Sequence, residues 1–295
     1  MRTVFAGTSS FAGSVLERLA ASEHRPQLVV TRPDRPRGRG RRLAAPPVAR
    51  IARELGIEVA QPPDINHETA RAQIAAAAPD VVCVCAFGAL IREPLLSDHM
   101  MLNVHPSLLP RWRGAAPIER AIMAGDRRTG VSIMRVTAGL DSGPVCLQEP
   151  EPISPDDTYG SLAARLEELG ARLLIRALDE RPRFTDQDEA GATYAEKIGP
   201  GDRLLDPTRP APELERTVRA LHPHVGARLA LPGGEMLAVH VAAARDQGPP
   251  PGELAAGDGR LVLGCAVGAL ELLVVQPAAG RPMDAAAYLR GHAPV

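Results

Sequence analysis

The tripeptide Asn103-Val104-His105 is the first place in this sequence where residue types and spacing could do chemistry. It closes a short apolar run, and residues two apart on a strand point to the same face. At the carboxyl end of a parallel strand, that face opens on the crevice where α/β sheets bind ligands. A neutral imidazole there can move a proton between an attacking amine and a leaving group, and an amide can donate to a developing oxyanion. The pair is therefore suited to acyl transfer, although a histidine at a strand end is also a common structural residue.

Asp141 is the candidate third member of this group. It lies in the turn Gly139-Leu140-Asp141-Ser142-Gly143, whose glycines would let the backbone come close to a site. Its carboxylate could orient the imidazole of His105 and stabilise the imidazolium. Periodicity does not bring Asp141 to His105, so an ordinary turn aspartate remains the alternative.

A second kind of chemistry is indicated by the loop from Arg32 to Arg42, which holds six arginines in eleven residues. Such a cluster attracts phosphate backbones through counterion release, and the planar guanidinium group can also bind bases. A solvated loop without function is the alternative interpretation. The arginines predicted to bind nucleic acid are Arg35, Arg37, Arg39, Arg41 and Arg42.

Other common sites are not indicated. The turn at Gly7 lacks the G-x-G-x-x-G spacing, so we predict no dinucleotide site. The four cysteines are scattered without a Cys-x-x-Cys pair, and we expect free thiols and no bound metal. His222 and His224 flank a proline in a predicted loop, and we assign them no ligand role.

The elements that must position these residues alternate between strands and helices. The continuous apolar run 81–86 is typical of a parallel strand covered on both faces. The alternation predicts an α/β fold with an open, mostly parallel sheet, closed by an amphipathic helix at 161–178. Further strands are predicted at 3–6, 28–30, 57–59, 101–104, 131–136 and 145–147.

The pattern changes in the last third of the chain. Residues 181–212 are polar and rich in proline and glycine, as in a linker. Brief apolar runs then follow between glycine and proline turns, which predicts a small β-barrel. The predicted organisation is a first domain at 1–180, a linker at 181–203 and a second domain at 204–295.

Composition limits the class of protein. With 45% hydrophobic and 23% charged residues, the chain should fold into a globular protein. The formal net charge is only −1, so attraction for a polyanion must come from local clusters such as the arginine loop. The sequence begins without a signal-peptide core, and no apolar stretch is long enough to span a bilayer, so we expect a cytoplasmic protein.

The stretch Asn103 to Ile118, NVHPSLLPRWRGAAPI, closely resembles the signature of the methionyl-tRNA formyltransferase family. Similar matches cover nearly the whole chain and are densest before residue 200. The resemblance implies a Rossmann-like formyltransferase domain joined to a carboxy-terminal OB-like β-barrel that helps to hold tRNA. The other matching segments are Phe5–Thr8, Pro33–Pro36, Gly38–Gly40, Gly139–Gly143 and Thr193–Ile198.

The same resemblance implies the roles of individual residues. The family's catalytic trio falls on Asn103, His105 and Asp141, and Arg39 is the arginine best placed to contact the acceptor end of the tRNA. The implied reaction is direct transfer of a formyl group from 10-formyltetrahydrofolate to methionyl initiator tRNA, without a metal. We expect a monomer. The implied folate-binding residues are Ser107, Leu108, Leu109 and Pro110.

Two other readings of these motifs stay open at this stage. The same trio could act on a different amine, such as an amino-sugar nucleotide or glycinamide ribonucleotide, or could release formate by hydrolysis. Alternatively, the arginine loop could bind RNA in a protein that is not an enzyme. The last third of the chain carries similar numbers of acidic and basic residues, so we expect tRNA recognition to depend mainly on the arginine loop.

Overall fold

The computed structural model describes residues 1–37 and 42–292. These residues form two compact units. The first unit contains 1–117, 129–152 and 163–195, and the second contains 118–128, 153–162 and the described residues from 196 onward. The domain limits expected from composition, at 180 and 204, stay predictions. Each unit is described by itself below.

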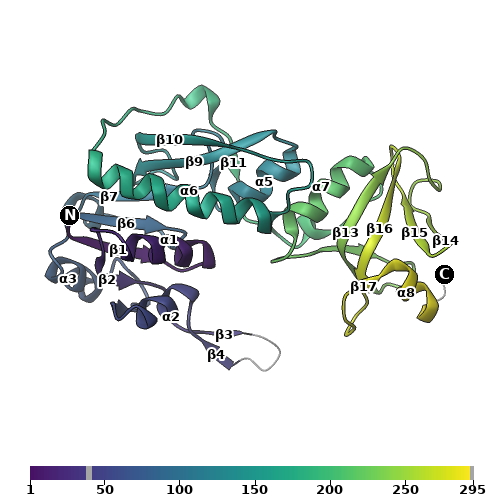
Figure 1. Ribbon diagram of the computed structural model, residues 1–295, viewed down its shortest axis with the longest axis horizontal. Helices are drawn as coiled ribbons and strands as arrows, with labels where there is room; N and C mark the ends of the chain where they lie inside the picture. Colours follow the sequence, from purple (N-terminus) through teal and green to yellow (C-terminus); the bar gives the residue numbers. More distant parts are fainter. Residues whose placement is uncertain (38–41, 293–295) are drawn as a thin grey trace. The chain divides into compact units, whose positions relative to one another are not determined.

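A seven-stranded sheet forms the centre of the first unit, in the order β10-β9-β7-β6-β1-β2-β5 (Figure 1). The five strands from β7 to β5 are parallel, and β9 runs antiparallel to β7. The mostly parallel Rossmann-like sheet predicted from the sequence is thereby confirmed. The strands are β1 (Thr3–Gly7), β2 (Pro26–Val30), β5 (Glu58–Ala60), β6 (Val81–Cys85), β7 (Met101–His105), β9 (Arg128–Arg135) and β10 (Val145–Pro152).

Helices connect and cover these strands, and α1 and α6 lie over the face of the sheet that is turned to the viewer in Figure 1. Helix α3 was not predicted, because its alanine-rich sequence has little contrast between an apolar and a polar face. The helices of this unit are α1 (Ser10–Ala20), α2 (Pro47–Glu54), α3 (Glu68–Ala76), α4 (Leu95–Asp98) and, from residue 163 onward, α6 (Tyr159–Glu180). Helix α5 (Pro117–Ala124) belongs to the second unit from residue 118 onward.

The two faces of the sheet have separate cores, because successive strand residues point to opposite sides. On one face Val82 and Met101 pack in a cluster with Ile74 of α3. On the other face Val104 meets α6 so closely that a Cβ on Gly170 would lie 2.8 Å from it. Met101, Asn103 and His105 follow one another at a spacing of two along β7, so the last two share the face that Val104 does not use.

Strand β6 is buried at every position, as expected for a central parallel strand. Burial raises the pKa of the Cys83 thiol to about 12. This thiol is therefore uncharged at neutral pH and fills core space rather than serving as a nucleophile.

Two short pairings lie outside the main sheet. Strands β3 (Arg35–Arg37) and β4 (Arg42–Ala44) form an antiparallel hairpin within the arginine-rich segment that we expected to be a loop. Strand β8 (Arg113–Gly114) pairs in parallel with β11 (Tyr194–Ala195). The second pairing brings part of the predicted linker onto the first unit.

The second unit consists of antiparallel strands in the order β12-β13-β16-β15-β14, with β17 paired to β16. Helices α7 (Ala211–Leu221) and α8 (Ala285–Gly291) pack on its core, which includes Leu214, Leu270 and Tyr288. The predicted small carboxy-terminal β-domain is confirmed. Its strands are β12 (Ala227–Ala230), β13 (Met236–Arg245), β14 (Leu254–Gly257), β15 (Arg260–Gly264), β16 (Ala269–Gln276) and β17 (Met283–Asp284).

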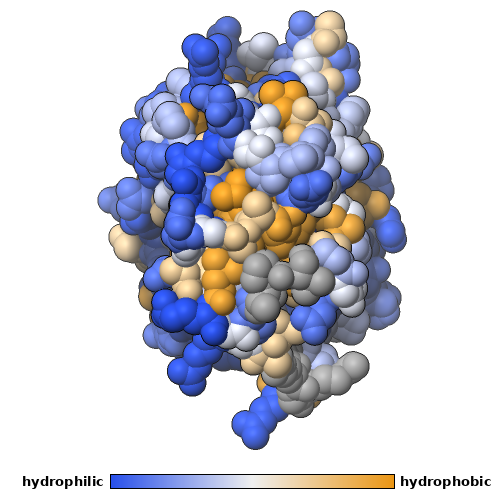
Figure 2. Space-filling view, turned by 90° about the vertical axis from the view of Figure 1, so that its right-hand side faces the viewer, coloured by the Kyte–Doolittle hydropathy of each residue, from blue (hydrophilic) through white to orange (hydrophobic). Residues whose placement is uncertain are grey.

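The surface of the molecule mixes polar and apolar areas. In the view of Figure 2, hydrophobic residues gather near the centre and hydrophilic residues surround them. Among the larger apolar side chains of the second unit, Val241 is 41% exposed. Within residues 1–37 and 42–292, no helix has the length and apolar character needed to cross a membrane.

Candidate active site

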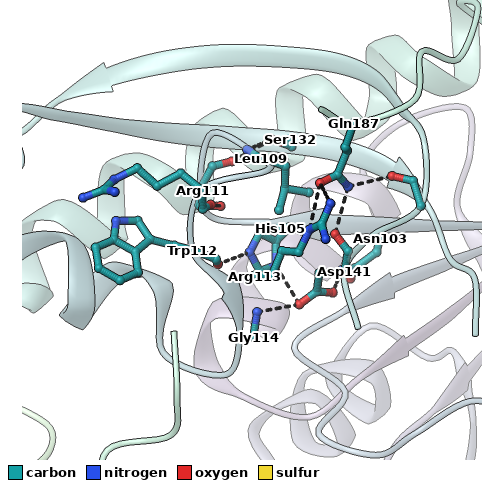
Figure 3. A network of polar contacts seen from close by, with 12 residues as sticks. Asn103, His105, Leu109, Arg111, Trp112, Arg113, Gly114, Ser132, Asp141 and Gln187 are labelled. Atoms are coloured by element: carbon teal, nitrogen blue, oxygen red, sulfur yellow. Dashed lines mark hydrogen bonds and ion pairs between the residues drawn. The ribbon is translucent and has the colours of Figure 1, made fainter. Parts of the chain in front are cut away.

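Three side chains predicted as a catalytic trio meet at the end of β7 (Figure 3). Asn103 Nδ2 donates to Asp141 Oδ1 at 3.5 Å. His105 Nδ1 lies 3.6 Å from Asp141 Oδ2. The same carboxylate oxygen accepts from the backbone N–H of Gly114 at 2.9 Å. The carboxylate is therefore held from three directions, by an amide, an imidazole and a main-chain donor.

The imidazole of His105 is almost fully buried, and both of its nitrogens have partners. Nε2 lies 2.8 Å from the main-chain carbonyl of Trp112. A carbonyl can only accept, so Nε2 carries a proton and the ring is oriented by Trp112. Nδ1 is then the position that can gain or lose a proton, and it faces Asp141. The orienting role expected for the Asp141 carboxylate stays a prediction, and the Trp112 carbonyl is a second group that fixes the ring.

The loop carrying Asp141 has an unusual backbone. Asp141 has φ +45°, in the left-handed region that L residues rarely adopt, although aspartate tolerates it better than most. The neighbouring Gly143 is required by space, because a Cβ there would lie 1.9 Å from the carbonyl oxygen of Arg135. The glycine-flanked turn seen in the sequence thus aims a carboxylate at β7, which periodicity could not indicate.

The segment Ser107–Pro110, expected to bind folate, is fixed to β9 through Ser132. Ser132 Oγ donates to the carbonyl of Ser107 at 2.6 Å and accepts from the N–H of Leu109 at 3.1 Å. Gln148 Nε2 adds bonds of 2.8 Å to Ser132 Oγ and 2.9 Å to the Leu109 carbonyl. A hollow of about 300 Å³ adjoins this segment. Its lining includes Leu109, Pro110, Cys146, Gln148 and Gln187.

A second layer of residues behind the trio was missed by the sequence analysis. Arg113 is only 2% exposed and donates to both Gln187 and Glu189. Gln187 in turn donates to the carbonyls of Asp141 and Gly143. We had assigned Gln187 and Glu189 to a linker because their segment is polar and rich in proline and glycine. The sequence signal nearest to this segment was the family match at Thr193–Ile198, which did not include Gln187 or Glu189.

The arginine cluster is described only in part. Arg35 and Arg42 are exposed at the start of β3 and of β4. The hairpin follows the carboxyl end of β2, and His105 is the last residue of β7. These two strands belong to the parallel part of one sheet, so the start of the hairpin and His105 lie at the same edge of that sheet. Arg39 and Arg41, together with the side chain of Arg37, lie outside the described residues.

Comparison with known proteins identifies the family. The family model described as formyl transferase matches residues 1–178, and the model for the formyl transferase C-terminal domain matches residues 197–293. A methionyl-tRNA formyltransferase of Halorhodospira halophila is 46% identical over 99% of this chain and 96% of its own length. This chain belongs to the methionyl-tRNA formyltransferase family. A relative of the same name from Methylococcus capsulatus is 44% identical over 99% of this chain and 97% of its own length.

Solved structures share the fold of this formyltransferase at lower identity. Methionyl-tRNA formyltransferase from Clostridium thermocellum matches with a TM-score of 0.61 and 14% identity, over 92% of this chain and 99% of its own. HypX from Aquifex aeolicus in complex with tetrahydrofolic acid matches with a TM-score of 0.68 and 20% identity, over 98% of this chain and 47% of its own. These similarities concern the fold.

Asn103, His105 and Asp141 are the candidate catalytic groups of this formyltransferase site. Among the residues that the structure describes, no group of three or more histidine, cysteine, aspartate or glutamate side chains could hold a metal ion. The trio offers an amide donor, an imidazole and a carboxylate around a single point. These groups can stabilise an oxyanion and move a proton.

Proposed function

We propose that this protein transfers the formyl group of 10-formyltetrahydrofolate to the amino group of methionine esterified to initiator tRNA. The observation that carries the proposal is that Asn103 and His105 both contact the carboxylate of Asp141. Two relatives that are 46% and 44% identical over nearly their whole length bear the name of this activity. We also expect the protein to act in the cytoplasm as a monomer.

In this reaction the methionyl amine attacks the formyl carbon, and a new C–N bond forms. The carbonyl oxygen becomes an oxyanion, for which Asn103 Nδ2 and a protonated His105 are suitable donors. The tetrahedral intermediate then collapses, and the bond between the formyl carbon and N10 of the folate breaks. One proton leaves the amine and one reaches N10, so the active-site groups are unchanged after a turnover.

The pair His105 and Asp141 is the proton carrier in this scheme. Because Nε2 is committed to the Trp112 carbonyl, only Nδ1 changes its protonation. A carboxylate 3.6 Å away stabilises the positive imidazolium that forms when Nδ1 takes the proton. Nδ1 can take a proton from the amine during its attack and return it to N10 of the folate when the tetrahedral intermediate collapses.

Substrate binding is divided between two segments. We assign the folate co-substrate to Ser107, Leu108, Leu109 and Pro110, whose backbone is fixed by Ser132. We assign the tRNA to the arginine cluster, because guanidinium groups bind phosphates strongly. The assigned arginines are Arg35, Arg37, Arg39, Arg41 and Arg42.

The direct test is a formylation assay with purified protein, 10-formyltetrahydrofolate and methionyl initiator tRNA. We expect acid-stable formyl-methionine to appear, and to form at least about 100-fold more slowly with His105→Ala. Parallel reactions should contain an amino-sugar nucleotide or no amine at all. Formylation of the sugar in preference to the tRNA, or release of formate without an acceptor, would overturn the proposed substrate.

A further inference from the structure

Gln187 bridges the loop that carries Asp141 and the buried side chain of Arg113. Its Nε2 donates to the carbonyl of Asp141 at 2.8 Å and to the carbonyl of Gly143 at 2.7 Å. Its Oε1 accepts from Nε and Nη2 of Arg113 at 3.1 and 2.9 Å. Carbonyls only accept and guanidinium only donates, so the amide can have only this orientation. Both hydrogens and the acceptor oxygen are in use.

Arg113 is fixed as firmly as Gln187. The guanidinium is nearly inaccessible, and its two terminal nitrogens also form a forked pair with Glu189 at 2.9 and 2.7 Å. Hydrogen bonding to Glu189 raises the pKa of Arg113, so the group stays charged. A buried cation with this many bonds has little freedom to move. Gln187 thus connects the Asp141 loop to a rigid anchor.

The same chain segment holds the carboxylate itself. Residue 114 directly follows Arg113, and its N–H donates to Asp141 Oδ2. Strand β8, which contains both residues, is in turn paired with β11. The Asp141 loop is therefore held at two points. Gln187 holds its main chain, and Gly114 holds its side chain, and both depend on the position of Arg113 (Figure 3).

We propose that Arg113 and Gln187 are positioning residues for formyl transfer, which keep the Asp141 carboxylate against His105 and Asn103. Arg113 donates to Gln187, and Gln187 donates to the carbonyls of Asp141 and Gly143, so their effect on the trio passes through the Asp141 loop. The inference rests on the proposed function for its kinetic readout only. Asp141 has a left-handed backbone, and a loop with such a residue needs outside support to persist.

Gln187→Glu is the most informative substitution. It keeps the size of the side chain and the acceptor for Arg113, but it turns oxygen toward the carbonyls of Asp141 and Gly143. We expect kcat to fall on the order of 100-fold, as for a displacement of about 1 Å in a reacting group. KM for methionyl-tRNA should change little, because Gln187 lines the hollow beside the folate segment and is not part of the arginine cluster. Gln187→Leu, which removes every bond, should lower kcat at least as much.

The matched control is Gln276→Glu in the second unit. Gln276 is also half-buried, accepts from His240 at 2.9 Å and donates to the carbonyl of Gly280 at 2.9 Å. The substitution therefore replaces the same kind of amide donor by an oxygen, at a residue that does not contact the Asp141 loop. We expect wild-type kcat from this variant. Equal loss of kcat in both glutamine variants would show a general effect of destabilisation and overturn the positioning role.

The fluorescence of Trp112 reports on the integrity of the site, because Trp112 is the only tryptophan in the sequence. Its N–H is held by Thr193 and its carbonyl holds His105, so unfolding of this segment should change its fluorescence. We expect Gln187→Glu to keep the wild-type emission while kcat falls. A red-shifted emission that parallels the loss of kcat would mean collapse of the site and would overturn the inference.

A crystal structure of Gln187→Glu gives a readout that does not depend on the substrate. We expect the Asp141 carboxylate to have left the N–H of Gly114. A carboxylate still in place, or wild-type kcat in this variant, would refute the inference. If the wild-type protein formylated no methionyl-tRNA, the proposed function would fail, whereas this structural comparison would still decide the positioning role.

Discussion

His105 presents Nδ1 to the carboxylate of Asp141 across 3.6 Å, although the two residues belong to separate segments of the chain. The other ring nitrogen is committed to the Trp112 carbonyl. The imidazole is therefore held by Trp112 through one nitrogen and faces the carboxylate with the other. This arrangement makes the two side chains a unit, so replacing either one should impair the same proton transfer.

Replacing His105 by asparagine should remove the proton carrier while keeping a side-chain donor for the Trp112 carbonyl. General acid and base groups contribute about 10²- to 10⁴-fold to rates, so we expect a loss of kcat in that range. Single-turnover formylation with saturating tRNA measures it. Circular dichroism should confirm an unchanged fold. A variant within a few-fold of wild type would remove His105 from the mechanism.

Asp141→Asn should preserve the shape of the loop, because asparagine also tolerates a positive φ and its oxygen can accept from Gly114. It loses the charge that stabilises the imidazolium. We expect a loss of kcat on the order of 10²- to 10³-fold, and little further loss when His105→Asn is added, since groups acting as a unit are not additive. Multiplicative losses in the double variant would mean that the two residues act separately.

Gly114→Ala should displace the donor that holds Asp141. Gly114 has φ +119°, and an added Cβ would lie 2.7 Å from the carbonyl oxygen of Ala195. We expect destabilisation of about 1–3 kcal/mol and a loss of kcat on the order of 100-fold. Gly56→Ala is the control, because its φ is +67° but nothing lies within 4 Å of the added Cβ. Urea titration and kcat together separate the two effects, and wild-type kcat in Gly114→Ala would contradict the role of this donor.

The arginine cluster should govern use of tRNA and not of folate. We expect Arg39→Ala to raise KM for methionyl-tRNA while KM for the formyl donor stays unchanged. For Arg42→Ala, loss of one phosphate contact should reduce the slope of log affinity against log salt by about 0.7 to 1. Titration of labelled tRNA at several salt concentrations measures this slope. Equal increases in both KM values would contradict the division between the two binding segments.

The stability of the second unit should depend on pH through Glu271. Its buried carboxylate is bonded to Arg260 and Arg245, which holds its pKa below the ordinary value of 4.5. A lowered carboxylate pKa stabilises the fold above the unfolded pKa, and this contribution is lost as the pH falls through the folded pKa. Both arginines are about half exposed, so solvent screening limits the effect.

The test variant for this ion pair is Glu271→Gln. At pH 7 it should lower the free energy of unfolding by about 1–2 kcal/mol, and the difference from wild type should shrink below about pH 4. Hydrogen exchange of β16 in the intact chain follows this unit directly. A difference that stays constant down to pH 3 would assign the effect to packing and not to charge.

Local patterns in the sequence were enough to predict most elements of the fold. The apolar run of β6 and the spacing of Asn103 and His105 on β7 depend on side-chain alternation, which is a property of neighbouring residues. The amphipathic helix α6 follows from the same kind of periodicity. Helix α3 and the hairpin of β3 and β4 escaped prediction because an alanine-rich stretch and an arginine-rich stretch carry little such contrast.

Tertiary structure alone decided how the site is assembled. The sequence by itself indicated an acyl-transfer pair at Asn103 and His105, and its long signature indicated the family. The family resemblance put Asp141 in the same trio, but local patterns could not bring its carboxylate to β7. Nor could they identify Trp112 as the partner of Nε2, or show that the polar segment with Gln187 supports the site. Each of these features depends on hydrogen bonds between segments that are distant in the sequence. The packing of whole elements sets the geometry of these bonds, and no local periodicity encodes it.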